Sequence, residues 1–324
     1  MNGGTAILGM VRLAENGDAT GVMTLNAGSL TANEITTGNT GAPQRELDFN
    51  GGTLAAGTDN ANFIHDLSAA NVQAGGAVID SAGHNVSINQ ALLDAGGGGG
   101  LTKIGTGTLY LNGANTYTGP TLVNVGTLGG TGAIAGPVTV ASGAALAPGA
   151  SIGTLTINNT LTLSAGSTTL VEVSLDGGTP HNDLVTGLTG VVYSGALVVS
   201  NVGTNALVGG TTFKLFQSAS PSIGNFTSVR ILPSGVGSFN PATGELRIPP
   251  AINPPHVSGG NLILTGTGGT AGGTYSWLAS TNVAAPLANW TTDTTGVSDG
   301  SGGFSNSFPI NPSVPARFFQ LRTP

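Results

Sequence analysis

Acidic side chains in two short segments are the residues whose types and spacing could support chemistry. In the first segment Glu46 and Asp48 follow Arg45, and Asp59 and Asp66 come shortly afterwards. Carboxylates that converge in space could bind Ca²⁺ or act as an acid/base pair in glycan cleavage. The alternative is a solvated loop, which we favour because the segment lacks the dense ligand spacing of calcium-binding loops.

The second segment contains Glu172, Asp176, His181 and Asp183. These residues could form a general acid/base set or a cation site, or they could form a polar turn, which we favour. Between residues 95 and 171 the chain contains no Asp or Glu, so its most regular part offers no carboxylate. The sequence therefore predicts no catalytic residue, no cofactor-binding residue and no metal ligand.

Other residue patterns that could indicate chemistry are isolated. The histidines lack metal-ligand spacing and are expected in surface turns; they are His65, His84, His181 and His256. The Gly-x-Ser-x-Gly match at Gly296–Gly300 is followed by more Gly and Ser, whereas a nucleophile elbow needs a helix there. The glycines at 96–100 lack the Lys-Ser/Thr ending of a phosphate loop. Loops are expected at both places.

The two tryptophans, Trp277 and Trp290, are candidate carbohydrate contacts because an exposed aromatic ring can stack on a sugar. The alternative is that a small domain needs both rings in its core. We favour the core for Trp277. Trp290 is a better candidate for sugar contact because it lies between Asn289 and Thr291, which are typical of a loop.

Composition excludes several classes of protein. Only 7% of residues are charged and the net charge is −7, which argues against nucleic-acid binding by clustered Lys and Arg. The chain has no cysteine, and no apolar run approaches the ~18 residues of a membrane span. Its first residues lack the features of a signal peptide, so we expect a fragment of a longer protein or a trimmed chain.

A Gly-small-Leu step recurs with a spacing of about 20 residues, which suits one coil of a solenoid. In each coil a short alternating run would form a strand and glycine would provide the corner. The copies begin at Gly28, Gly52, Gly107, Gly126, Gly153 and Gly195. We expect about ten coils with parallel strands over residues 1–247. The segment 62–67 is the best helical candidate, and we interpret it as a turn or a single helical loop.

Residues 100–128 resemble the autotransporter-associated β-strand repeat, through Gly100-Leu101-Thr102-Lys103-Ile104-Gly105 and Asn115-Thr116-Tyr117-Thr118-Gly119. The segments 72–80 and 83–88 resemble what leads into that repeat. The resemblance implies a secreted passenger with a right-handed parallel β-helix. Residues from about 182 to 247 resemble the closing coils of such helices, because their strands are longer and more aromatic.

The C-terminal part of the chain differs in composition. Four prolines in residues 248–255 predict a linker, since proline is excluded from central strands. Residues 256–324 contain seven of the sixteen aromatic residues and are expected to form a small β-sandwich. Its segments Tyr275–Asn282, Asn289–Thr291 and Arg317–Arg322 resemble a terminal module of large secreted proteins of the Verrucomicrobia.

The sequence thus predicts an all-β protein, a right-handed parallel β-helix followed by a small β-sandwich. The expected function is that of a non-catalytic extracellular or cell-surface structural or adhesive protein, a rigid stalk or scaffold. The alternatives are a polysaccharide-binding protein and a β-helical glycan lyase or hydrolase. Expected partners are a surface polysaccharide and a second copy, which would meet the strand and corner at Gly4–Gly9 of the N-terminal coil.

Overall fold

The computed structural model describes residues 1–38, 40–41, 43–233, 235 and 237–323. Its regular structure is almost entirely β-strand, and the described residues form only two single-turn 3₁₀ helices, η1 (Asp176–Gly178) and η2 (Leu287–Asn289). Within these residues, no helix has the length and apolar character needed to cross a membrane. The all-β fold class is confirmed.

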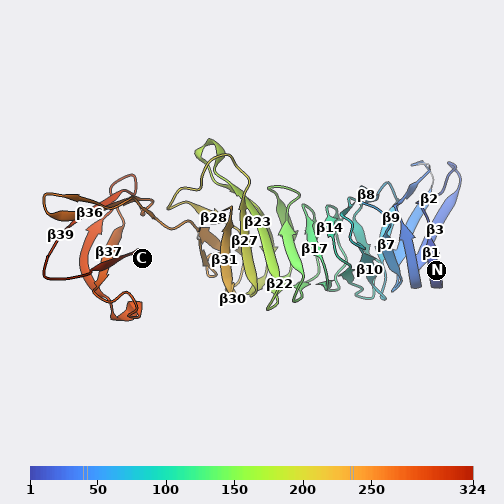
Figure 1. Cartoon of the computed structure of the whole chain (residues 1–324). Coiled ribbons are helices and arrows are strands. Elements are labelled where there is room, and N and C mark those ends of the chain that lie inside the picture. Colours follow the sequence, from blue (N-terminus) through green and yellow to red (C-terminus); the bar gives the residue numbers. More distant parts are fainter. Residues whose placement is uncertain (39, 42, 234, 236, 324) are drawn as a thin grey trace. The chain divides into compact units, whose positions relative to one another are not determined.

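The chain divides into two compact units. The first contains Met1–Thr204 together with Phe213–Gly235 and Phe239–Leu246. The second contains the segment from Arg247 onward and the loop Asn205–Thr212. Figure 1 shows the strands of the first unit stacked in sequence from β1 to β31.

The first unit is a parallel β-helix of ten coils, each of which contributes one strand to a ten-stranded sheet. Ala77 pairs with Leu101 and Leu101 with Thr121, so equivalent positions are 24 and 20 residues apart. The strands, in order across this sheet, are β1 (Asn2–Ile7), β4 (Ala27–Ala32), β7 (Thr53–Ala56), β10 (Ala77–Asp80), β13 (Leu101–Ile104), β16 (Thr121–Val123), β19 (Val138–Val140), β22 (Thr160–Leu163), β26 (Gly190–Tyr193) and β30 (Ile223–Gly224).

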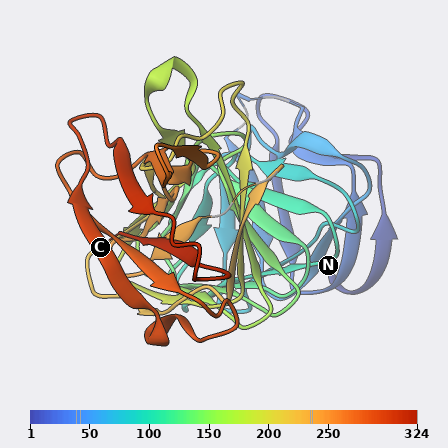
Figure 2. The same ribbon diagram turned by 60° about the vertical axis from the view of Figure 1, so that its left-hand side comes forward.

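A second, eleven-stranded sheet takes the next strand of each coil and one antiparallel addition. Its stacked strands are β2 (Met10–Leu13), β5 (Glu34–Thr37), β8 (Asn60–Ile64), β11 (Val86–Ile88), β14 (Thr108–Leu111), β17 (Thr127–Gly130), β20 (Ala145–Pro148), β23 (Thr168–Ser174), β27 (Ala196–Asn201) and β31 (Ser228–Leu232). The addition is β24 (His181–Asn182), which pairs antiparallel with β23. Figure 2 gives an oblique view in which strands of successive coils follow one another.

The third face of the β-helix is interrupted. One sheet contains β3 (Thr20–Leu25), β6 (Gln44–Phe49), β9 (Ala69–Val72) and β12 (Leu92–Asp94), and another contains β15 (Ala114–Asn115), β18 (Ala133–Ile134), β21 (Thr154–Ile157), β25 (Leu184–Leu188) and β29 (Phe216–Ser218). Between β12 and β15 the Asn115 side chain replaces part of the ladder, because its Oδ1 accepts a hydrogen bond from Leu92 N at 3.0 Å.

Side chains at equivalent positions of successive coils form columns inside the β-helix. Leu54 pairs with Ile79, Ile79 with Lys103, and Lys103 with Val123, and none of these four side chains is exposed. The alternation of inward and outward residues is a direct consequence of the two-residue period of a strand. The expected apolar interior is present, with one lysine inside it.

Asparagines form hydrogen-bonded ladders on the outside of the coils. Asn26 Nδ2 donates to Asn2 Oδ1 at 2.7 Å, and Asn50 Nδ2 donates to Asn26 Oδ1 at 2.8 Å. Asn112 Nδ2 likewise donates to Asn89 Oδ1 at 2.8 Å. Asn26 and Asn89 each donate to one amide and accept from another along the stack, so these outward positions are hydrogen-bonded without charges.

The glycine corners are present, but not at every expected position. Gly28, Gly107, Gly126 and Gly195 have left-handed φ values of 81°, 92°, 75° and 70°. Gly52 has no such φ, and a Cβ there would lie 2.9 Å from Leu25 O of the preceding coil. Gly153 also lacks a left-handed φ. At these two positions the expectation of a left-handed corner was wrong; at Gly52 the small residue is required by close packing between coils.

The segment 62–67, interpreted from the sequence as a turn or helical loop, contains part of strand β8 instead. Phe63 and Ile64 are consecutive and both fully buried. The register between β8 and β11 shifts at this point, as in a β-bulge. Two adjacent inward residues break the alternation, and this break is what resembled a helical pattern.

Aromatic rings fill the last coils of the β-helix. Tyr193, Phe216, Phe226 and Phe239 are buried, with ring centroids 4.9–6.1 Å apart. A three-stranded sheet lies in this region, made of β28 (Thr212–Lys214), β33 (Glu245–Arg247) and β32 (Ser238–Asn240). Bulky rings close the interior where the stack of coils stops.

The second unit is a small β-sandwich. One sheet contains β34 (Ala251–Ile252), β35 (His256–Ser258), β36 (Asn261–Thr267) and β39 (Phe304–Pro309), and the other contains β37 (Thr274–Ser280), β38 (Thr291–Val297) and β40 (Phe318–Arg322). The strand pairings of its described residues are antiparallel. The core between the sheets contains Leu264, Tyr275, Trp277, Phe304 and Phe308.

Candidate functional site

The first acidic segment does not form one cluster. Asp48 accepts a hydrogen bond from Asn71 Nδ2 at 2.8 Å, and Asp59 accepts one from Asn85 N at 2.8 Å, which lowers the pKa of the Asp59 carboxyl. Arg45 Nε donates to the main-chain oxygen of Asp66 at 3.3 Å. In the described part of the chain, no three His, Asp or Glu side chains are placed to hold a metal ion.

His65 lies between two carboxylates, an arrangement that sequence reasoning missed. Its Nε2 lies 2.9 Å from Glu34 Oε1, and its Nδ1 lies 2.8 Å from Asp66 Oδ2. Partial burial alone would lower the pKa of this imidazole, but hydrogen bonds to Glu34 and Asp66 raise it above its usual value. Glu34 and His65 are 31 residues apart; Glu34 begins β5, and His65 directly follows the neighbouring strand β8.

The second acidic segment is split by the structure. Glu172 and Asp183 lie side by side at the hairpin of β23 and β24, where Glu172 N donates to Asp183 Oδ2 at 2.7 Å. The other two residues face elsewhere: Asp176 Oδ1 accepts from Thr204 N at 3.0 Å, and His181 Nε2 lies 3.0 Å from Thr179 Oγ1. The expected polar turn is present as η1, which precedes β24.

Asp183 is a buried carboxylate with both oxygens occupied. Its Oδ1 accepts a hydrogen bond from Gly153 N at 2.9 Å, and its side chain is 2% exposed. Burial raises the pKa of the Asp183 carboxyl to about 7, with hydrogen bonds from Glu172 N and Gly153 N opposing the rise. Both oxygens bind main-chain N–H groups, so Asp183 joins the loop before β21 to the hairpin, and its burial leaves little access for a substrate.

The two tryptophans have different environments. Trp277 is 1% exposed, and its Nε1 donates to Asn306 Oδ1 at 3.0 Å, so its ring has no face available to a sugar. Trp290 follows η2 and is half-buried, with its Nε1 bound to Ala285 O at 2.9 Å. Of the two candidate sugar contacts, only Trp290 keeps part of its surface accessible.

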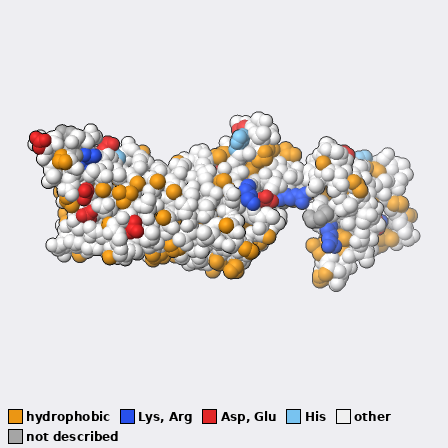
Figure 3. Space-filling model, turned by 180° about the vertical axis from the view of Figure 1, so that it is seen from behind, with side chains coloured by type: hydrophobic (Ala, Val, Ile, Leu, Met, Phe, Trp, Pro, Cys, Tyr) orange, Lys and Arg blue, Asp and Glu red, His pale blue; other side chains and the backbone are white. Residues whose placement is uncertain are grey.

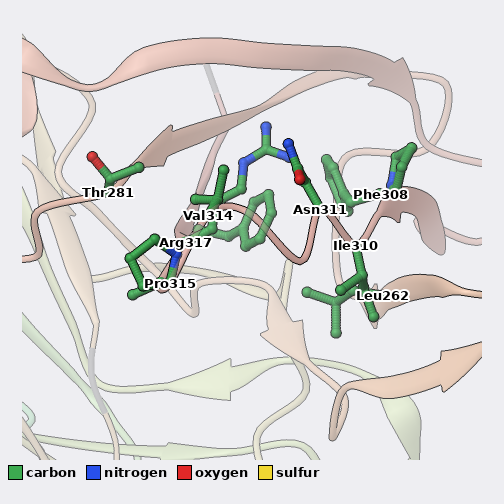
Figure 4. Close-up of a pocket in the computed structure, with 11 residues that line it drawn as sticks. Leu262, Thr281, Phe308, Ile310, Asn311, Val314, Pro315 and Arg317 are labelled. Atoms are coloured by element: carbon green, nitrogen blue, oxygen red, sulfur yellow. The ribbon is translucent and has the colours of Figure 1, made fainter.

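A groove of about 480 Å³ lies on the sandwich beside the end of β39. Figure 4 shows Leu262, Phe308, Ile310, Val314 and Arg317 around it. The Arg317 guanidinium lies 4.9 Å from the centroid of Phe319 and is paired with Asp293. The groove is largely apolar, and its one cation is already paired, so it offers little chemistry beyond contact.

The Gly-x-Ser-x-Gly match, expected to be a loop, begins in a strand: Gly296 and Val297 end β38, and the loop starts at Ser298. Ser298 follows β38 directly and is 5% exposed, and Asp299 accepts hydrogen bonds from Ser301 N and Gly303 N at 2.8 Å. No helix follows it in the described residues.

Figure 3 shows that the visible face of the β-helix carries few charged side chains.

Residues 101–129 match the family model of the passenger-associated-transport-repeat. The chain carries this repeat. Over 116 residues the chain is 34% identical to the "Adhesin BmaC autotransporter" of Brucella suis biovar 1 (strain 1330). The aligned segment covers 33% of this chain and 3% of that protein. The chain therefore spans only a small part of that relative's length. No solved structure matches the chain.

Polar side chains of the passenger-associated-transport-repeat are turned into the β-helix. Lys103 is fully buried, and its Nζ donates to Ser81 Oγ, Ile104 O, Gly105 O and Val125 O at 2.7–3.1 Å. Burial lowers the pKa of the Lys103 ammonium to about 8. Oxygens at the corners of three consecutive coils thus surround the ammonium and join those coils.

Asn115 also joins coils within this segment. Its Nδ2 donates to Gly113 O and to Ala133 O of the next coil, both at 2.9 Å. Tyr117 makes a local contact instead: its hydroxyl lies 2.7 Å from Thr121 Oγ1, and burial raises the pKa of this phenol. All three side chains, of Lys103, Asn115 and Tyr117, are buried and are not available to a ligand.

Proposed function

We propose that this chain is a non-catalytic extracellular structural or adhesive element, in which the β-helix is a rigid stalk or scaffold. The observation that carries the proposal is the pair of unbroken parallel ladders through ten coils. Supporting it are the passenger-associated-transport-repeat at residues 101–129 and the partial similarity to a protein named as an adhesin.

The mechanism would be geometric. Each coil pairs with its neighbours on two or three faces, so the stack resists bending and exposes few unpaired main-chain groups along its length. Asparagine ladders and buried polar residues such as Lys103 and Asn115 join successive coils. A weakly charged surface of this kind would expose adhesive side chains at a fixed spacing of ~4.8 Å per coil.

The carboxylates give little support to catalysis. Asp183 is buried, and each of its oxygens accepts a hydrogen bond from a main-chain N–H group. Asp176 accepts a hydrogen bond from Thr204 and does not converge with Glu172. A glycan-cleaving enzyme needs two carboxyl groups that both reach the scissile bond. We therefore place the adhesive role ahead of the lyase or hydrolase alternative.

Attachment of coated beads would test the adhesive role. Beads carrying the folded chain should attach to host-cell monolayers, extracellular matrix or polysaccharide films more than beads carrying heat-unfolded chain. Equal attachment of both kinds of bead to all three surfaces would contradict the proposal.

A polysaccharide-binding role through the sandwich is the second candidate, favoured by the accessible part of Trp290. Replacing Trp290 by alanine should then weaken retention on the polysaccharide and leave the fold intact, since the ring lies outside the core cluster of the sandwich. Phe319→Ala provides the control for a general loss of sandwich packing. Unchanged retention of the Trp290→Ala variant would remove this candidate.

A further inference from the structure

A groove of about 290 Å³ lies on the outer face of the eleven-stranded sheet of the β-helix. Its lining includes Tyr110 of β14, Ala147 of β20, Leu170 and Glu172 of β23, and Val198 and Ser200 of β27. In this sheet β17, β20 and β23 lie between β14 and β27. Four steps of ~4.8 Å give the groove a length of about 19 Å across the strands.

Tyr110 lies flat on the sheet at one end of this groove. It pairs in register with Gly129 of the next coil, and a Cβ on Gly129 would lie 3.0 and 3.1 Å from ring atoms of Tyr110. The ring therefore needs a glycine beneath it. Tyr110 is half-buried and lines the groove, and its hydroxyl makes no hydrogen bond to the described part of the protein.

Aliphatic side chains continue the floor of the groove beyond the ring. Leu170 pairs in register with Val198, and Leu170 is 38% exposed although it lies on a β-helix rich in outward polar residues. Ala147 pairs with Gly129, so the position between the ring and these side chains is small. An uncharged, partly aromatic floor of this kind favours the apolar face of a ring-shaped ligand.

A carboxylate borders the groove. Glu172 lines the groove, and its Oε2 is buried with no hydrogen-bond partner among the described residues. A buried acceptor without a donor has lost its solvation, so a rotation of the Glu172 side chain that brings this oxygen to a ligand hydroxyl or N–H group is favoured. The neighbouring Asp183 holds the main chain of Glu172 through its Oδ2 and so fixes the position of this edge.

We propose that this groove binds a neutral sugar residue of an extracellular glycan, with Tyr110 stacking on the ring and Glu172 accepting hydrogen bonds from its hydroxyl groups. The inference names the ligand class of the proposed adhesive function and rests on it. A net charge of −7 and the carboxylate at the groove disfavour acidic glycans. Only two carboxylates line this groove, and both oxygens of Asp183 already accept main-chain hydrogen bonds, which disfavours a metal ion.

Affinity electrophoresis of the whole chain tests the groove. The gels contain neutral polysaccharides (a mixed-linkage glucan, a galactomannan and a xylan) or acidic ones (polygalacturonate and alginate). At least one neutral polymer should retard the chain, and the acidic polymers should not. Tyr110→Ala should weaken that retardation by about tenfold or more, whereas Tyr110→Phe should keep most of it because the ring face remains.

Matched variants separate a local effect from a loss of fold. Glu172→Gln should weaken binding of the neutral polymer less than Tyr110→Ala, because the amide oxygen can still accept a hydrogen bond. Leu122 is 36% exposed, close to the 38% of Leu170 in the groove, but it lies in the ten-stranded sheet. Leu122→Ala should therefore leave the retardation unchanged. Circular dichroism melts should coincide for all variants.

Two outcomes would overturn the inference: retardation by no neutral polymer, or equal retardation of the wild type and Tyr110→Ala. Bead attachment keeps this failure distinct from failure of the adhesive role. If wild-type and Tyr110→Ala beads attach equally to cells or matrix, the adhesive role stands and the groove is not its site. If wild-type beads attach to nothing, the adhesive role itself fails.

Discussion

Replacing Lys103 by methionine should destabilise the β-helix, although the change removes a charge from an apolar interior. Methionine has nearly the length of lysine and fills the same column between Ile79 and Val123. What it lacks is the ammonium group, whose three N–H donors lie within hydrogen-bond distance of four oxygens at the corners of three coils. The partners are mostly main-chain carbonyls, which no change of side chain removes.

The magnitude follows from the acceptors that would lose their donor. Val125 O accepts a hydrogen bond only from Lys103 among the described residues, and Gly105 O would keep only a 3.3 Å contact with Ser81 Oγ. Each buried acceptor left without a donor costs about 1–3 kcal/mol. Relief from burying an ammonium offsets part of this cost. We expect a net loss of about 2–4 kcal/mol in the free energy of unfolding.

Urea unfolding followed by two signals gives a clean measurement. Both tryptophans belong to the second unit, so their fluorescence reports on the sandwich, whereas far-ultraviolet circular dichroism reports mainly on the β-helix. Lys103→Met should move the circular dichroism midpoint and leave the fluorescence midpoint in place. The control Lys214→Met changes a lysine that is 47% exposed and should cost less than about 1 kcal/mol. A Lys103→Met protein as stable as the wild type would refute the reasoning.

Four further predictions follow from other parts of the structure. Gly126→Val should destabilise the protein more than Gly143→Val. Both glycines have a left-handed φ, but only at Gly126 would a Cβ lie 2.5 Å from carbonyl oxygens. A lower melting temperature for Gly143→Val than for Gly126→Val would contradict the close packing assigned to the Gly126 corner. Because Asp183 has a raised pKa, the folded state binds its proton more tightly than the unfolded state. The free energy of unfolding should therefore fall as the pH rises from ~4 to ~7. Asp183→Asn should flatten that slope, and identical slopes would exclude Asp183 as its source. The chain should associate through edge strand β1, where Ile7 is 78% exposed; light scattering that stays monomeric at high concentration, or association unchanged by Ile7→Lys, would exclude this. Incubation with neutral and acidic polysaccharides, with and without Ca²⁺, should yield no new reducing or unsaturated ends, and any product lost on Glu172→Gln would overturn the non-catalytic role.

The coils could be predicted from the sequence because their signals are local. Alternation in runs such as Thr108–Leu111 sets the inward face of a strand, and the structure buries Leu109 and Leu111 there. Glycine marks the corners for the same local reason, the left-handed φ at Gly107 and Gly126. At Gly52 the requirement is a neighbour in the preceding coil, which no local pattern shows.

Inward polar residues could not be predicted in the same way. Lys103 is two residues after Leu101 in β13, so the alternation along the strand predicts that its side chain points inward. The cost of burying an ammonium group favours a surface position instead. The oxygens that resolve this conflict belong to Ser81 and Val125, about one coil away in either direction. Only the register between coils brings them together.

The candidate sites depended even more on long-range geometry. Glu172 and Asp183 are 11 residues apart and meet because η1 turns the chain back as β24. Nothing in the sequence indicated that Tyr110 would lie on Gly129 or border the same groove as Glu172. By contrast, the different fates of Trp277 and Trp290 followed from local context, since Trp277 alternates within a strand and Trp290 follows a loop.

The interruption of the third face between β12 and β15 divides the β-helix into a four-coil block and a six-coil block. At this junction two ladders continue, while Asn115 and Thr116 side chains replace part of the third. Because the third face has no strand pairing there among the described residues, the four N-terminal coils would open as one cooperative unit with early amide exchange in β12. Because fewer ladders cross this junction than cross those within the first four coils, it is the point where gene recombination could add or remove whole coils with little disturbance to the rest of the stack.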